Sequence, residues 1–224
     1  MPFNLLSKQH PLVYLITNGA TTDQTTSATE DFSHILQLIH AAVIAGIDLI
    51  QIREKKLTAR VLFELSRSAA EVVRGSSTKL LINDRADIAA AAGADGVHLA
   101  TTSLPPQVIR RTFGDEFLIG ASTHSLAEAN VAREQGADFV VFGPVFETAS
   151  KSEYGGAKGI EELSKLTAAL GGFPVLALGG ITEGNAADCV SAGAQGIAAI
   201  SLLQKPERLE DLTRKIHGFA LKRS

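Results

Sequence analysis

The sequence predicts an α/β protein built as a single (β/α)8 TIM barrel. Three observations support this fold class. Eight short apolar segments alternate with eight segments of helical periodicity. The apolar segments are continuous, as expected for parallel strands that are covered on both faces. Glycine turns recur between helix and strand. A closed barrel satisfies all three observations, and a doubly wound open sheet is the alternative that they leave open.

The strands are expected where short apolar runs enter polar or glycine-containing loops. LVYLIT is the first such run, and it leads into Asn18-Gly19. In chain order, the expected strands cover residues 12–17, 48–53, 79–83, 96–99, 117–122, 139–142, 174–180 and 196–203.

The helices are expected where apolar residues recur at helical spacing. Asp31 or Ser33 is expected to cap the first helix, and Ser125 with Glu128 forms a capping box at the fifth. The expected helices cover residues 32–45, 58–73, 86–92, 104–113, a segment that begins at Ser125, 160–170, 183–192 and a last segment from Pro206 to about residue 219.

Four helix-to-strand turns share one design, in which a helix ends on glycine and an apolar strand follows. The segments are AGIDLIQI, AGADGVHL, QGADFVVF and AGAQGIAAI, with Gly46, Gly93, Gly136 and Gly193 at the turns. Glycine readily adopts the left-handed conformation at a helix C-terminus. The recurrence predicts a repeated αβ unit.

Composition limits the domain count and the classes of partner. The chain has 224 residues, of which 45% are hydrophobic, and a formal net charge of -3. We expect one domain over residues 1–224 with its core at about 12–219. The near-neutral charge gives no reason to expect nucleic acid. Without a signal peptide or a run long enough to span a bilayer, we expect a cytoplasmic protein that does not bind membranes. A homo-oligomer is left open.

Polar residues gather where the predicted strands end. In a (β/α)8 barrel, functional groups lie at the C-terminal ends of the strands. The opposite loops are glycine and alanine turns, so this asymmetry predicts a functional site at one rim. The residues at that rim are Asn18, Gln51, Arg53, Lys55, Asn83, Asp84, Arg85, His98, Ser122, His124, Thr148, Ser150, Lys151, Gly179, Gly180 and Ser201.

Two parts of the rim predict anion binding. Gly179 and Gly180, with Ile200 and Ser201, match the place where many barrels bind phosphate through backbone N–H groups. The alternative is that the glycines merely turn the chain.

A second group of rim residues carries positive charge and hydroxyl donors. Arg53, Lys55 and Lys151 supply three cations, and Thr148 and Ser150 add hydroxyls. This charge exceeds what one monophosphate needs and indicates a diphosphate as well. A polar surface loop is the alternative for the residues near Lys151.

Asp84, beside Asn83, offers carboxylate oxygens to Mg²⁺, which takes the rest of its ligands from water and substrate phosphates. The alternative is an ion pair with Arg85 or Arg53.

His124 is the candidate acid or base near neutral pH, unless it only hydrogen-bonds a neighbour. His98 points into the same rim. The remaining histidines lie off the strand ends and are expected at the surface; they are His10, His34, His40 and His217.

The motifs QIREKKL, LLINDRADIAAAAGADGVHL, IGASTHSLAEA, FGPVFETASK and PVLALGGIT resemble the thiamine phosphate synthase family over residues 12–203. The resemblance implies an Mg²⁺-dependent enzyme that joins hydroxymethylpyrimidine diphosphate to thiazole phosphate and releases diphosphate. It implies that Asp84 binds Mg²⁺. It further assigns the diphosphate to Gln51, Arg53, Lys55, Asn83 and Lys151, the pyrimidine or phosphates to Ser122, Thr148 and Ser150, and the thiazole phosphate to Gly180, Ile200 and Ser201. We assign catalytic roles to Arg53, Lys55, Ser122, His124 and Lys151.

One departure from the family pattern bears on the metal. The family continues DGVHL with Gly-Gln-x-Asp, whose aspartate is the second Mg²⁺ ligand, but here Ser103 stands at that position. The chain also resembles the sister branch of thiazole tautomerases, which use a histidine at the position of His124. That branch need not keep Lys55 with Asp84, so we favour the synthase. A silent phosphate-binding regulator is the third hypothesis.

Overall fold

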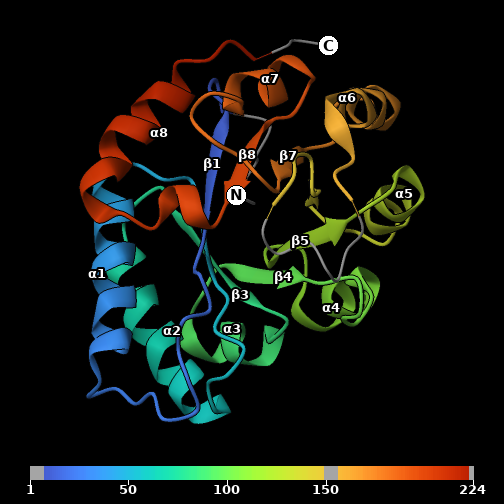
Figure 1. Ribbon diagram of the computed structural model, residues 1–224. Coiled ribbons are helices and arrows are strands. Elements are labelled where there is room, and N and C mark those ends of the chain that lie inside the picture. Colours follow the sequence, from blue (N-terminus) through green and yellow to red (C-terminus); the bar gives the residue numbers. More distant parts are fainter. Residues whose placement is uncertain (1–7, 149–155, 222–224) are drawn as a thin grey trace.

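The computed structural model describes residues 8–148 and 156–221, which form a closed barrel of parallel strands (Figure 1). Each strand pairs with the next along the chain, and the last pairs with the first, with Leu12 opposite Gly196. The predicted barrel is confirmed. Its strands are β1 (Leu12–Ile16), β2 (Leu49–Ile52), β3 (Lys79–Asn83), β4 (Gly96–Leu99), β5 (Leu118–Thr123), β6 (Phe139–Phe142), β7 (Val175–Leu178) and β8 (Gly196–Ala199).

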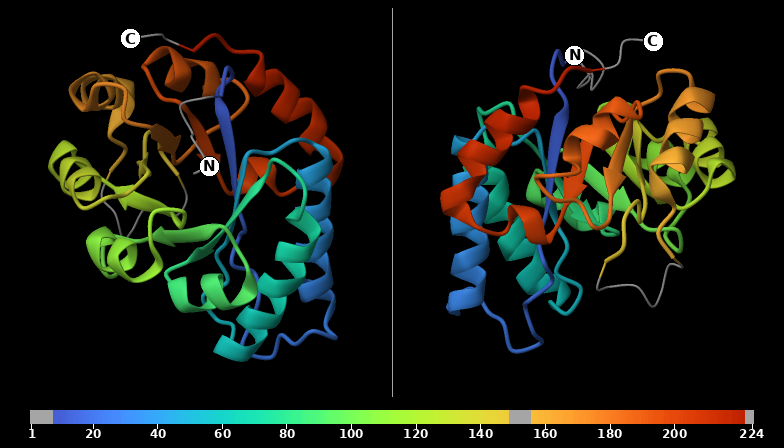
Figure 2. Two further views of the ribbon diagram at one scale, coloured as in Figure 1. Left: turned by 180° about the vertical axis from the view of Figure 1, so that it is seen from behind. Right: turned by 45° about the horizontal axis from the view of Figure 1, so that its top comes forward.

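Helices surround the strands, as the two further views in Figure 2 show. They are α1 (Glu30–Ile44), α2 (Ala59–Val73), α3 (Ala86–Ala92), α4 (Pro106–Phe113), α5 (Leu126–Glu134), α6 (Gly159–Leu170), α7 (Ala186–Ser191) and α8 (Leu209–His217), with short 3-10 helices η2 (Ser201–Leu203) and η3 (Pro206–Arg208) before α8. In the described ranges, no helix is both long and apolar enough to cross a membrane.

The cap of the first helix and the end of the eighth strand were predicted wrongly. The first helix begins after Thr29, so Asp31 and Ser33 lie inside it rather than at its cap. Asp31 instead accepts a hydrogen bond from the Thr25 hydroxyl, which holds the preceding loop against the helix. The eighth strand ends at Ala199, four residues before the predicted end at Leu203.

Other local predictions are confirmed. The Ser125 hydroxyl accepts the Glu128 N–H at 3.2 Å at the start of α5. The glycines at the four repeated turns all have positive φ, between 73° and 97°. In each repeated αβ unit, a glycine in a positive-φ conformation therefore connects the helix to the next strand.

Strand side chains fill two separate cores. One lies inside the barrel and contains Tyr14, Leu49 and Phe139, and the other lies between the barrel and the helices. Because both faces of each strand are covered, most strand residues are apolar. Gly120 lies beside the interior rings, where a Cβ atom would come within 2.4 Å of the Phe139 ring. The absence of a side chain at Gly120 therefore makes room for them.

Candidate active site at the barrel mouth

Strand register brings several predicted site residues to one end of the barrel. Gln51 and Asn83 each lie two residues beyond an interior leucine, so alternation directs their side chains toward the barrel axis. Asn83 pairs with His98, and Ser122 lies two residues beyond Gly120, the partner of His98 on β5. Strand register therefore brings Gln51, Asn83, His98 and Ser122 to the same end of the barrel.

A buried polar network lies beneath this mouth. The Gln51 amide donates to the Tyr14 hydroxyl at 2.9 Å, and His98 Nε2 lies 2.9 Å from Ser122 Oγ. Burial raises the pKa of Tyr14, although the hydrogen bond from Gln51 opposes this shift. The phenol is therefore neutral at physiological pH.

His98 is also neutral at pH 7. Burial lowers its pKa to about 4, the nearby Asp84 carboxylate raises it, and the Arg53 guanidinium lowers it further. A neutral ring both donates and accepts, so His98 can orient the Ser122 hydroxyl from beneath the site.

The free energy of unfolding should fall between pH 7 and pH 5, in part because of His98. The unfolded histidine titrates near pH 6.5 and takes up a proton before the folded one does, which costs the folded state about 2 kcal/mol at pH 5. Urea denaturation at the two pH values measures this loss. His98→Gln, which keeps a polar group near Ser122, should lose about 2 kcal/mol less over the same interval. An equal loss in both proteins would contradict the assignment.

A cavity of about 210 Å³ opens where β2 and β3 end. Lys55 and Asp84, the predicted diphosphate-binding cation and the predicted Mg²⁺ ligand, both line it. Asn83 and Arg85 also line it, together with three apolar side chains. The residues that line it are Ile52, Glu54, Lys55, Leu57, Leu62, Asn83, Asp84 and Arg85.

The two positions predicted to hold a metal are in direct contact. The Ser103 hydroxyl donates to Asp84 Oδ1 and accepts the Ala100 N–H at 2.7 Å. Asp84 Oδ1 also accepts the Ala100 N–H at 3.1 Å, and its Oδ2 accepts the Asn83 amide at 3.0 Å. Asp84 adopts a left-handed φ of 59°, which aspartate tolerates better than most residues.

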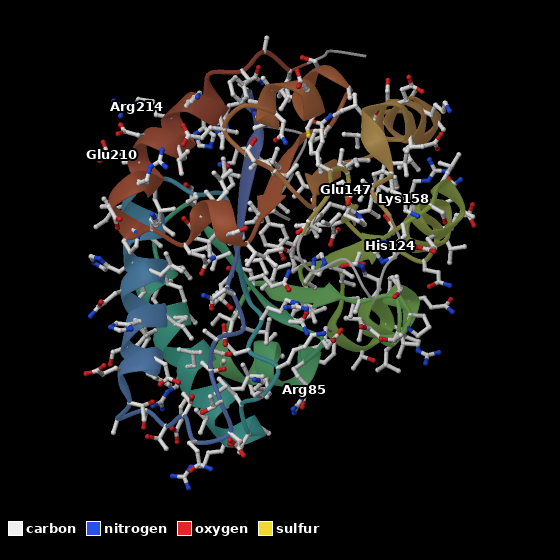
Figure 3. All side chains as sticks on the ribbon, viewed as in Figure 1. Arg85, His124, Glu147, Lys158, Glu210 and Arg214 are labelled. Carbon is white, nitrogen blue, oxygen red and sulfur yellow. The ribbon has the colours of Figure 1, made fainter. Side chains whose placement is uncertain are left out.

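The proposed ion pair between Asp84 and Arg85 is not what the structure shows. The Arg85 guanidinium pairs with Asp87 at 2.6 Å, and Figure 3 shows its side chain directed outward on the α3 side. Asp84 therefore has its carboxylate at the mouth. Its carboxylate and the Ser103 hydroxyl are an all-oxygen donor set, which fits Mg²⁺ with its remaining ligands from water and substrate phosphate.

Glu54 supports the mouth, although it was not among the predicted site residues. Its buried carboxylate accepts hydrogen bonds from the Gly19 N–H at 3.1 Å and from the Thr21 N–H and hydroxyl at 3.2 and 2.7 Å. The neighbouring Arg53 N–H donates to Thr17 Oγ1 at 2.8 Å. These contacts fasten the loop after β1 to the end of β2. The only sequence signal was the position of Glu54 between two predicted site cations.

Gly179 and Gly180 allow the loops after β6 and β7 to approach closely. Both have positive φ, and a Cβ atom on Gly180 would lie 2.5 Å from the Glu147 carbonyl oxygen. The Phe146 N–H donates to the Gly179 carbonyl at 3.0 Å. Thr148 is half-buried in the same loop. The predicted site residues Ser150 and Lys151 lie outside the described residues.

His124 lies between β5 and the loop after β6. Its Nδ1 is 2.5 Å from the Gly143 carbonyl oxygen, and its backbone N–H donates to the Glu128 carboxylate at 2.6 Å. Figure 3 places the side chains of His124, Glu147 and Lys158 on this side of the barrel. This contact matches the interpretation in which His124 hydrogen-bonds a neighbour rather than acting as an acid or base.

The end of β8 lies beside the β7 glycines. Ile200 turns the chain, and η2 begins at Ser201 with its N-terminus at the mouth. The Gln204 amide donates to the carbonyl oxygens of Ile16 and Ile200 at 3.0 and 2.8 Å, which secures the barrel seam. Backbone N–H groups at such a turn suit a phosphate.

The sequence and the fold of this chain are both similar to those of one family of known proteins. Residues 13–203 match the sequence model of thiamine monophosphate synthases. A thiamine-phosphate synthase of Methanoculleus marisnigri is 41% identical over 180 residues, covering 80% of this chain and 83% of that protein. One of Chlorobium luteolum is 40% identical over 188 residues, covering 84% and 88%. Among solved structures, a thiamine phosphate pyrophosphorylase of Pyrococcus furiosus is similar with a TM-score of 0.76 and 29% identity, covering 96% of this chain and 100% of that one.

Proposed function

The chain belongs to the thiamine monophosphate synthase family, and from that premise we propose that it joins hydroxymethylpyrimidine diphosphate to thiazole phosphate with release of diphosphate. This makes it a transferase of thiamine biosynthesis. The observation that carries the assignment to this site is the cavity in which Lys55, Asn83 and Asp84 meet at the ends of β2 and β3.

In the proposed reaction, the bond between the pyrimidine methylene carbon and the diphosphate oxygen breaks, and its electron pair leaves on that oxygen. The lone pair of the thiazole nitrogen then forms the new C–N bond, so no protein nucleophile is needed. Arg53, Lys55 and Lys151 stabilise the departing negative charge. Gln51 and Asn83 orient the diphosphate from the interior side of the mouth, and Thr148 and Ser150 contribute hydroxyl donors.

Asp84, with the Ser103 hydroxyl beside it, would hold Mg²⁺. When bound, the ion neutralises diphosphate charge as it develops. One protein carboxylate is enough for an ion that draws other ligands from water and phosphate.

The second substrate would bind on the opposite side of the mouth. Gly179 and Gly180, together with Ile200 and Ser201, offer backbone N–H groups to the thiazole phosphate. Ser122 would lie between the two substrates, and His98 Nε2 lies 2.9 Å from its hydroxyl oxygen. The diphosphate, which carries more negative charge than the thiazole phosphate, would then bind on the side of the mouth with Arg53 and Lys55.

A turnover assay tests the proposal. Purified protein with both substrates and Mg²⁺ should release diphosphate and form thiamine phosphate, and omission of either substrate should stop the release. Isomerisation of a thiazole carboxylate phosphate that His124→Ala abolishes would instead identify a tautomerase. Saturable binding of the phosphates without either reaction would identify a regulator. Either result would contradict the synthase assignment.

Ser103→Asp should lower the Mg²⁺ concentration needed for half-maximal turnover. The new carboxylate would lie beside Asp84, which the Ser103 hydroxyl already contacts, and two carboxylates hold the ion more strongly than one. Titration of turnover with Mg²⁺ measures the change. Ser103→Asn is the uncharged control and should not strengthen the response. If both variants respond equally, the added charge does not reach the ion.

A further inference from the structure

Two histidines and an aspartate cluster at the end of the barrel opposite the mouth. His10 precedes β1, Asp48 immediately precedes β2, and His217 ends α8. The end of α8 passes beside the start of β1 in both Figure 1 and Figure 2. His10 and His217 were expected at the surface, and the structure differs from that expectation. They are half-buried and face the same carboxylate.

The cluster has the geometry of a three-ligand set. One candidate ligand atom from each of His10, Asp48 and His217 lies within 4.8 Å of the others. His217 Nε2 is 2.9 Å from Asp48 Oδ2, and His10 Nε2 is 4.0 Å from Asp48 Oδ1. The two imidazole rings lie next to each other, with centroids 3.9 Å apart.

Neighbouring contacts orient two of these groups. His10 Nδ1 is 3.2 Å from the Pro11 carbonyl oxygen. A proton on Nδ1 would bond to that oxygen and leave the Nε2 lone pair directed at Asp48, the arrangement that orients metal-binding histidines. Asp48 is 1% exposed and accepts the Val13 N–H at 3.0 Å. The carboxylate is therefore fixed, while the histidines give access from solvent.

We propose that His10, Asp48 and His217 form a binding site for a divalent transition-metal ion such as Zn²⁺. Two imidazoles and one carboxylate are typical ligands of zinc, whereas magnesium prefers oxygen ligands to imidazole nitrogen. Donor atoms around tetrahedral zinc lie about 3.3–3.6 Å apart, given metal–ligand distances of about 2.0–2.2 Å. The distances from Asp48 oxygens to His217 Nε2 and His10 Nε2, 2.9 and 4.0 Å, lie on either side of that spacing. A bound ion would join the segment before β1 to the end of α8, two segments that are far apart in the sequence.

Substitution of Lys8 should change zinc affinity in the opposite direction to substitution of a ligand. Its ammonium lies 3.3 Å from Asp48 Oδ1, where it occupies part of the carboxylate that the metal would use. A metal ion must compete with this positive charge. Lys8→Ala should therefore increase zinc affinity, whereas removal of a ligand should decrease it.

Isothermal titration of the full chain with Zn²⁺, after removal of metals by a chelator and with Mg²⁺ in excess, tests the proposal. We expect one zinc ion per chain and a melting temperature that rises with zinc concentration. His10→Ala and His217→Ala should each weaken binding by at least about tenfold, since even the outer partners of metal ligands can be worth that much. His10→Ala leaves the bond between His217 and Asp48 intact, so it tests the site without disturbing that contact.

Matched controls separate this site from the mouth. His40→Ala removes an exposed histidine on α1, and Asp84→Asn changes the mouth, so both should bind zinc as the parent protein does. Zinc binding that both His10→Ala and His217→Ala leave unchanged, or no binding at all, would overturn the proposal. So would a Lys8→Ala variant that binds zinc more weakly while remaining folded.

Discussion

Asp84→Asn should reduce kcat for thiamine phosphate formation by about a hundredfold to a thousandfold, the loss typical when a key electrostatic contact to a transition state is removed. Asparagine keeps the size and the Oδ1 acceptor that Ala100 and Ser103 use. It also tolerates the left-handed φ of 59° at this position. The change therefore removes charge with little effect on the backbone. Steady-state kinetics over a range of Mg²⁺ concentrations measures it.

Asp87→Asn is the control for this substitution. Asp87 lies three residues away, is mostly exposed and pairs with Arg85. It does not line the cavity between β2 and β3. Its variant should retain nearly full activity. If Asp87→Asn and Asp84→Asn lose activity equally, general charge loss on the α3 side is responsible, and the role of Asp84 in the reaction is wrong.

Gly196→Ala should destabilise the barrel by about 3 kcal/mol or more, at the upper end of the cost of overpacking. A Cβ atom at this position would lie 2.1 Å from the Leu12 carbonyl oxygen and 2.5 Å from the Leu12 nitrogen. Both are main-chain atoms of the strand that closes the barrel, so they cannot move aside as a flexible side chain can. The melting temperature should fall by about 6–12 °C.

Gly184→Ala is the matched control for Gly196→Ala. The nearest atom to its new Cβ would be Thr182 Oγ1 at 3.8 Å, an ordinary contact distance. Its free energy of unfolding should stay within about 0.5 kcal/mol of the parent value. Thermal and urea unfolding of the two variants give the comparison. A Gly196→Ala protein as stable as Gly184→Ala would show that the seam between β1 and β8 can open without cost.

Most of the fold could be predicted because its signals are local. The strands at 79–83, 96–99 and 139–142 and the helix at 86–92 agree with prediction to the residue. Errors arose where local patterns compete. The apolar residues after Ala199 were predicted to extend the strand, yet they turn into η2, and Leu203 is buried in the outer core. A short run of apolar residues is compatible with either a longer strand or a buried 3-10 helix.

The candidate site was predicted less completely. Residues at strand ends could be assigned to one rim because parallel strands place their carboxyl ends together. The support from Glu54 was missed because its partners Gly19 and Thr21 belong to another strand's loop. For the same reason, the sequence did not indicate that His10 and His217 share Asp48.

The sequence by itself determined the alternation of strands and helices, the glycine-ended repeats and the rim that carries the polar residues, because these depend on residues close together in the chain. Only the tertiary structure decided which of those polar groups touch. The contact of Ser103 with Asp84, the Glu54 contacts with the loop after β1 and the cluster around Asp48 depend on strand register and barrel closure. These bring together residues from distant segments, and local periodicity does not encode such distances.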